Sequence, residues 1–159
     1  MAVPAGGGDA GWPDWAPTGV NVADYVPHRT LKQTTSSTTG DEDVYYLTFD
    51  DDTRPTGETV DRLITDGIAL VTSRVTPLHA SSYDTARLIA TLYAAAAVER
   101  SWPHDDQSLQ RANDMERRMD AMLAGLVVSN DDANDGGPPD ELLPVYSFPT
   151  PVAWGDSYL

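Results

Sequence analysis

Three histidines are the residues of this chain best suited to bind a metal or transfer a proton near neutral pH. His28, His79 and His104 lie beside prolines or in expected turns, and no spacing between them is typical of a metal site. We therefore interpret all three as surface histidines without a catalytic or metal-binding role. The sequence also contains no glycine-rich phosphate loop, no HExxH motif and no nucleophile elbow.

Clusters of acidic and amide side chains are a second potential source of chemistry. Positions one, three, five and twelve of a calcium-loop template are matched by Asn130, Asp132, Asn134 and Glu141. Asp135 stands where that loop needs glycine, and two following prolines stiffen the segment, so we interpret the match as coincidental. Asp50-Asp51-Asp52 is interpreted as a solvated turn. Carboxylates are too abundant for any acid–base pair to be singled out, so we expect no catalytic residue, no metal, no cofactor and no enzymatic activity.

The charge balance restricts the classes of partner. The 159 residues include no cysteine and carry 25 acidic against 10 basic side chains, a formal net charge of −15. Disulfides and thiolate metal sites are thereby excluded, and electrostatic binding to nucleic acid or to an anionic membrane is disfavoured. Because the acidic residues are spread along the chain, we favour adaptation to high salt, in a halophilic archaeon or its virus, over mimicry of DNA. No apolar stretch is long enough for a membrane span and no signal pattern opens the chain, so we expect a soluble, intracellular protein.

The hydrophobic pattern predicts a mainly α protein with a small antiparallel bundle of about three helices. A short β-prone run, residues 44–49, precedes them. The first helix is expected from about residue 56 to 75, with Val60, Ile64, Gly67, Ile68, Val71 and Val75 on one face. Pro77 breaks the chain before a second helix that ends near Arg100. The third is expected from about Asp105 to Ala124, ended by Gly125, with inward-facing Leu109, Ala112, Met115, Met119, Met122 and Leu123.

The flanks differ from this core in composition. We divide the chain into an extended N-terminal arm (1–43), a helical core (44–128), a flexible acidic spacer (129–141) and an extended docking segment (142–159). Aromatic residues in solvated arms are typical of docking sites. The candidate partner-binding residues are therefore Trp12, Trp15, Tyr146, Phe148, Trp154 and Tyr158. In the second helix, the candidate subunit-packing residues are the small side chains Ala94, Ala95, Ala96 and Ala97.

The order of elements over residues 45–128 resembles the head–tail connector (adaptor) proteins of tailed viruses. Phe49 and Thr53-Arg54-Pro55-Thr56, followed by an amphipathic helix, are similar to the opening of that family. Leu88 through Ala97 resembles its alanine-rich second helix, and Leu123-Ala124-Gly125-Leu126 the end of its long third helix. The arm and the docking segment have no counterpart that we can align, which leaves their detailed contacts open.

The resemblance implies a structural virion protein in the neck, at the head–tail interface, assembled in the host cytoplasm. Such adaptors form a ring of subunits, commonly twelve, between the portal and a tail or stopper protein. Genomic DNA passes through the channel without specific binding, and an acidic wall would repel its phosphates. The alternative is an acidic DNA mimic or regulatory binding protein of a halophilic virus. A mimic needs a compact rigid acidic face, whereas an assembly protein needs extended segments that order on a partner.

Overall fold

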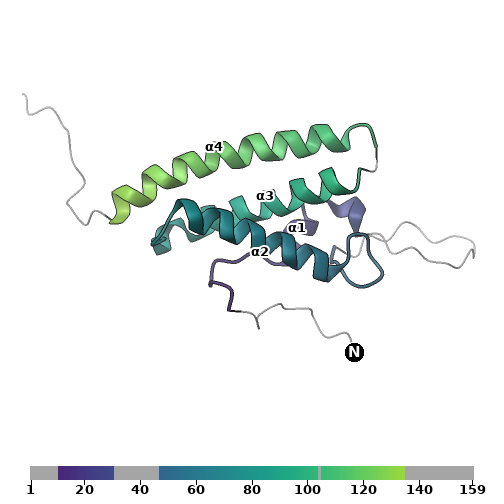
Figure 1. The fold of residues 1–159 in the computed structure, drawn as a ribbon, viewed down its shortest axis with the longest axis horizontal. Helices are drawn as coiled ribbons and strands as arrows, with labels where there is room; N and C mark the ends of the chain where they lie inside the picture. Colours follow the sequence, from purple (N-terminus) through teal and green to yellow (C-terminus); the bar gives the residue numbers. More distant parts are fainter. Residues whose placement is uncertain (1–10, 31–46, 104, 135–159) are drawn as a thin grey trace, which may run out of the picture.

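The computed structural model describes residues 11–30, 47–103 and 105–134, and over these residues the protein is mainly helical (Figure 1). Two short elements come first, and three long helices then lie side by side. The elements in chain order are α1 (Gly19–Ala23), the 3-10 helix η1 (Pro27–Arg29), α2 (Gly57–Arg74), the 3-10 helix η2 (Ala80–Ser82), α3 (Tyr83–Ser101) and α4 (Ser108–Asn134).

The α2 helix follows its sequence pattern closely. Its buried residues are Val60, Ile64, Gly67 and Val71, which recur at steps of three and four and so form one apolar face. Glu58 in the first turn and Arg74 in the last turn complement the helix dipole. The helix predicted for residues 56–75 is therefore confirmed to within one residue at each end.

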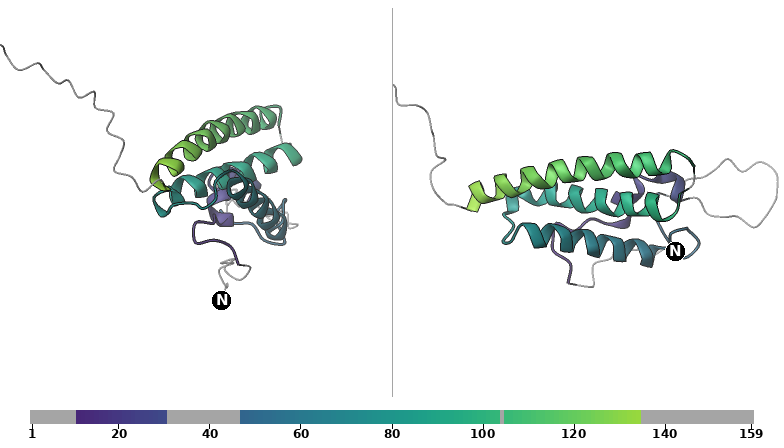
Figure 2. Two further views of the ribbon diagram at one scale, coloured as in Figure 1. Left: turned by 60° about the vertical axis from the view of Figure 1, so that its left-hand side comes forward. Right: turned by 45° about the horizontal axis from the view of Figure 1, so that its top comes forward.

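The α3 helix is the central element, because it contacts α2 on one side and α4 on the other (Figure 2). A helix between two others must be apolar almost all the way round, and α3 buries Ile89, Leu92 and Val98 on different faces. Ala94, Ala95 and Ala96 are at most 1% exposed within this single chain. Their small side chains thus pack between helices of the same subunit, not between subunits as predicted; Ala97 is partly buried.

The α4 helix is longer than the sequence predicted. It begins at Ser108 and passes through Gly125 to Asn134, so Gly125 does not end it and the first six residues of the predicted spacer are helical. A glycine inside a helix costs only about 1 kcal/mol, and buried Leu126 and Asn130 hold the continuation in place. The predicted inward face is correct for Ala112 and Met119 but wrong for Leu109, which is 51% exposed.

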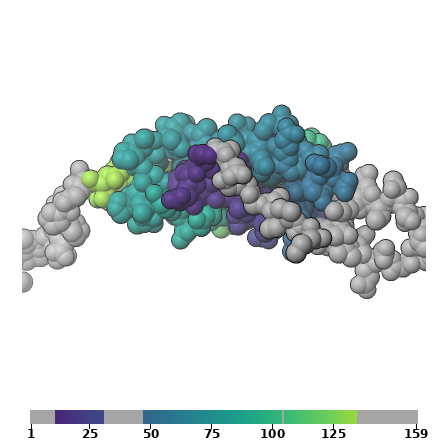
Figure 3. Space-filling view, turned by 90° about the horizontal axis from the view of Figure 1, so that it is seen from below, coloured from purple at the N-terminus to yellow at the C-terminus, as the bar shows by residue number. Residues whose placement is uncertain are grey.

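The N-terminal segment is not an extended arm over residues 11–30. Trp15 is 5% exposed, and Val22, Ala23 and Val26 are fully buried against α2 and α3. In the space-filling view this purple segment lies between the teal and blue surfaces of the long helices (Figure 3). The predicted strand is also absent from its described part, residues 47–49, where Leu47 has a φ of 52° and Phe49 is buried. Residues 44–46 and the docking segment, 142–159, lie outside the described residues.

Two glycines in the middle of long helices have opposite surroundings, and this difference can be measured. A Cβ added to Gly67 would lie 2.9 Å from the carbonyl oxygen of Ala90, whereas one added to Gly125 would meet nothing within 4 Å. We expect Gly67→Ala to lower the free energy of unfolding by about 1–3 kcal/mol, because α2 and α3 must separate. Gly125→Ala should raise it by about 0.5–1 kcal/mol. Denaturant unfolding of both variants checks this, and equal effects would contradict the close approach of α2 to α3.

Candidate functional site

The most concentrated set of charged groups lies around the carboxylate of Glu99, near the end of α3. Its side chain has no exposed surface. The Nε2 atom of His28 lies 2.5 Å from Oε1 of Glu99, and the Nη2 atoms of Arg29 and Arg111 lie 3.6 Å and 3.2 Å from Oε2. We call these four residues the Glu99 cluster. It joins η1 and the start of α4 to the last turns of α3.

The two arginines of the Glu99 cluster are held by further contacts. Arg29 donates a hydrogen bond to the backbone carbonyl of Trp102 just after α3. Arg111 donates to Oδ1 of Asp105 at 3.0 Å and to Oγ of Ser108 at 3.1 Å. The hydrogen bond from Arg111 is the largest cause of the lowered pKa of the exposed Asp105 carboxyl. These additional hydrogen bonds help to hold each guanidinium group in position beside Glu99.

His28 has a pKa below its ordinary value of 6.5, and the first cause is burial, which penalises the charged imidazolium. Glu99 acts in the opposite direction, but Arg29 and Arg111 both lower the pKa further. Burial together with the two guanidinium groups thus outweighs the attraction of the Glu99 carboxylate. The imidazole is therefore neutral at pH 7, and its Nε2–H can donate to Glu99.

This arrangement favours a structural role over a catalytic one. Both oxygens of Glu99 face nitrogen atoms of the same chain, and none of its side-chain surface is accessible. A general acid or base must be within reach of the proton that it transfers, whereas Glu99 is enclosed by its partners. The Glu99 cluster thus connects the N-terminal segment and the start of α4 to the core.

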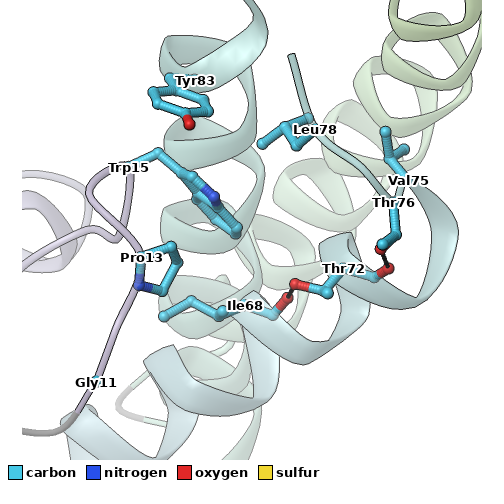
Figure 4. Close-up of a pocket in the computed structure, with 9 residues that line it drawn as sticks. All are labelled: Gly11, Pro13, Trp15, Ile68, Thr72, Val75, Thr76, Leu78 and Tyr83. Carbon is cyan, nitrogen blue, oxygen red and sulfur yellow. Dashed lines mark hydrogen bonds between the residues drawn. The ribbon is translucent and has the colours of Figure 1, made fainter. Parts of the chain in front are cut away.

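A second feature is a hollow of about 390 Å³ beside the N-terminal segment (Figure 4). Its apolar wall contains Pro13, Trp15, Ile68, Val75, Leu78 and Tyr83, and its rim contains Gly11, Thr72 and Thr76. Gly11, Pro13 and Trp15 come from the N-terminal segment, and the other residues come from α2, the α2–α3 connection and the start of α3. We call it the Trp15 hollow.

The connection after α2 is bound to the last turns of α4, next to the Trp15 hollow. Asn130 donates from Nδ2 to the carbonyl of Pro77 at 2.9 Å and accepts from the backbone N–H of His79 at 2.7 Å. Asn134 donates to the same Pro77 carbonyl at 3.0 Å. Asn130 and Asn134, which fit a calcium-loop template in the sequence, are therefore helical residues that hold a turn; Glu141 lies outside the described residues.

Some of the predicted site residues lie in or against the core of the chain, and others lie outside the described residues. Trp15 is buried in the chain's own core, which does not fit a docking role on another protein, and Trp12 is partly buried against the core. His79 accepts a hydrogen bond from the backbone N–H of Ser81. Four predicted partner-binding residues lie outside the described residues: Tyr146, Phe148, Trp154 and Tyr158. His104 also lies outside them.

Sequence reasoning missed the Glu99 cluster, and it was wrong about His28, which is not a surface residue without a role. One signal was present, because Glu99 follows Leu92 and Ala95 at helical steps of three and four on the face that is buried. A carboxylate at such a position needs cationic partners. The sequence did not show which of the arginines would supply them.

Within the parts of the chain that the structure describes, no group of three or more His, Asp or Glu side chains could hold a metal ion. None of the helices there combines the length and apolar character needed to cross a membrane. No family model, curated protein or solved structure matches the chain. The residues of the chain itself are therefore the basis on which a function can be proposed.

The Glu99 cluster makes a clear prediction about stability. Glu99→Gln keeps the shape of the side chain but removes the buried counter-charge of Arg29 and leaves Arg111 with only the exposed Asp105. We therefore expect the free energy of unfolding to fall by about 3–5 kcal/mol. The matched control is Glu116→Gln, because Glu116 pairs with Arg100 at a side-chain exposure of 39%. That surface pair should contribute about 1 kcal/mol or less. Equal losses in the two variants, measured by denaturant unfolding, would contradict a structural role for the cluster.

The lowered pKa of His28 predicts how stability depends on pH. The unfolded chain takes up a proton near pH 6.5, whereas folded His28 does so only at lower pH. The contribution to stability is therefore complete above pH 6.5 and is lost as the pH falls through the pKa of the folded state. We expect His28→Gln to lose less stability than the wild type between pH 7.5 and 5.5, measured by denaturant unfolding at each pH. If the wild type instead gains stability relative to His28→Gln on acidification, the pKa of His28 is raised in the folded state and the prediction is wrong.

Proposed function

We propose that this chain is a structural subunit of a virus particle, a head–tail adaptor built on a small antiparallel helical bundle. In this proposal the subunits form a ring, commonly of twelve, between the portal and a tail or stopper protein in the virion neck. The ring is assembled in the host cytoplasm, encloses the path of the DNA and has no enzymatic activity. A haloarchaeal virus is the proposed source.

The observation that carries the proposal is an uncharged stripe on the outer face of α4. Ala124 and Gly125 both lie within three or four residues of Ala121 on one side and of Val128 on the other, so the four share one face of α4, and all four are exposed. Val128 is 63% exposed, the highest value among the large hydrophobic residues that are described. In a chain with a net charge of −15, this stripe offers a place where a helix of a neighbouring subunit can approach closely.

The order and character of the helices support the same proposal. The segment Thr53–Thr56 leads directly into α2, α3 is rich in alanine, and α4 is long. These are the features that resemble the adaptor family. The α4 helix continues beyond Gly125, unlike the third helix of the family pattern, and this extends the outer stripe by one further turn.

The net charge suits a wall around a DNA channel. Phosphate groups are repelled by a surface with an excess of carboxylates, so DNA can pass without binding. The enclosed Glu99 cluster fits an assembly protein as well, because a rigid subunit loses less conformational entropy when it joins a ring.

Imaging in molar salt tests the proposal. Negative-stain images of the purified full-length chain, alone and with portal protein, should show rings. We expect Ala124→Arg to abolish them, because a long charged side chain would occupy the outer stripe of α4. The matched control is Ala69→Arg on the exposed face of α2, which should leave the rings unchanged.

Each other outcome has a defined meaning. Wild-type protein that stays monomeric both alone and with portal would overturn the adaptor proposal and favour the DNA-mimic alternative. Rings formed equally well by Ala124→Arg would show that subunits do not meet through the stripe on α4. Circular dichroism of both variants establishes that the helices are intact, which is expected because both alanines are exposed.

A further inference from the structure

The Trp15 hollow has the lining of a site for an extended, proline-rich peptide. Trp15, Tyr83 and Pro13 lie along one side of it, and Ile68, Val75 and Leu78 complete the apolar wall (Figure 4). Grooves lined by aromatic side chains are the usual receptors for proline-rich segments, whose preformed extended backbone loses little entropy on binding. Tyr83 is half-buried and Trp15 is 5% exposed, so a ligand in the hollow would contact the accessible part of the Tyr83 ring and the small accessible part of Trp15.

The chain itself contains a segment of the matching composition. Residues 142–159 include Pro144, Pro149 and Pro151 together with Tyr146, Phe148 and Trp154. Asp156 is the only charged side chain among these residues, although the whole chain has 25 acidic ones. Such a segment is better matched to an apolar, aromatic wall than to the acidic surface of the rest of the protein.

The position at which the described chain ends also favours this ligand. Asn134, the last residue of α4, is hydrogen-bonded to the carbonyl of Pro77, and the neighbours of Pro77, Thr76 and Leu78, line the Trp15 hollow. The seven residues 135–141 can span up to about 23 Å when extended. The proline-rich segment therefore starts within reach of the hollow of its own subunit, at an effective concentration of about a millimolar or more.

We propose that the Trp15 hollow binds residues 142–159 of the same chain in the free subunit, with Phe148-Pro149-Thr150-Pro151 against Trp15 and Tyr83. This contact covers the apolar side chains of the segment before any partner is present. The inference is independent of the adaptor proposal, because it concerns a contact within a single subunit. It is compatible with that proposal if the segment moves to a partner on assembly.

Disulfide trapping tests the contact directly, because the natural chain has no cysteine. The test protein is the full-length chain with Thr76→Cys at the rim of the hollow and Thr150→Cys in the segment. The control protein carries Thr65→Cys in place of Thr76→Cys, since Thr65 is also an exposed threonine of α2 but does not line the hollow. With oxidised glutathione as oxidant, we expect the intramolecular disulfide to form about tenfold faster from position 76 than from position 65.

A second pair of variants tests whether the faster disulfide formation at position 76 depends on the hollow. Thr72 and Thr65 are both exposed on α2, and each donates its hydroxyl to the carbonyl four residues earlier, at 2.8 Å and 2.9 Å. Only Thr72 lines the hollow. In the protein with cysteines at positions 76 and 150, Thr72→Glu should slow trapping to the control rate, whereas Thr65→Glu should leave it unchanged.

Three results would overturn the inference. Equal trapping rates at positions 65 and 76 would show that the segment has no preference for the hollow, and an unchanged rate in Thr72→Glu would place the contact elsewhere. Disulfide-linked dimers from a mixture of the two single-cysteine chains, formed faster than the intramolecular bond, would assign the hollow to the segment of a second copy. Ring formation is scored separately by imaging, so failure of this contact and failure of the adaptor proposal are distinguishable.

Discussion

The buried carboxylate of Glu99 is the constraint around which the rest of the structure is arranged. A charge without exposed surface is tolerated in a protein only if cations and hydrogen bonds replace the lost water. Here the replacements come from two places in the chain, His28 and Arg29 before the long helices and Arg111 at the start of α4. Pairing with this one carboxylate therefore ties the N-terminal segment and the start of α4 to the last turns of α3.

The small side chains of α3 make this arrangement possible. Ala90 lies against Gly67 of α2, and Ala94, Ala95 and Ala96 are buried among the surrounding elements. Short side chains bring the helix axes close together but contribute little apolar area per residue. The core accordingly gains part of its area from the N-terminal segment, whose Val22 and Val26 are fully buried. The net charge of −15 opposes a compact state except where salt screens it. The contacts that hold the N-terminal segment on the core also offset this repulsion.

These features suit a protein whose role depends on shape more than on reactive groups. The Glu99 carboxylate is enclosed, while two exposed features of the described residues could take part in recognition, the uncharged stripe on α4 and the Trp15 hollow. They lie on different elements, so one subunit can contact a neighbour through α4 while the hollow holds an extended segment. In the proposed adaptor, the stripe on α4 would meet a neighbouring subunit while the hollow stays free for an extended segment.

The sequence by itself determined the mainly helical character, the bounds of α2 and the break at Pro77, because these depend on periodicity and on proline, which act over a few residues. The predicted strand is absent from its described part, residues 47–49. The end of α4 at Gly125 and the extended arm over residues 11–30 were wrong, because contacts between residues far apart in the chain decided them. Asn130 binds the turn at Pro77 and so continues α4 past a glycine, and Trp15 and Val26 find apolar partners on α2 and α3. Only the tertiary structure selected Arg29 and Arg111 from nine arginines as the partners of Glu99, since electrostatic pairing depends on distances in space that sequence spacing does not encode.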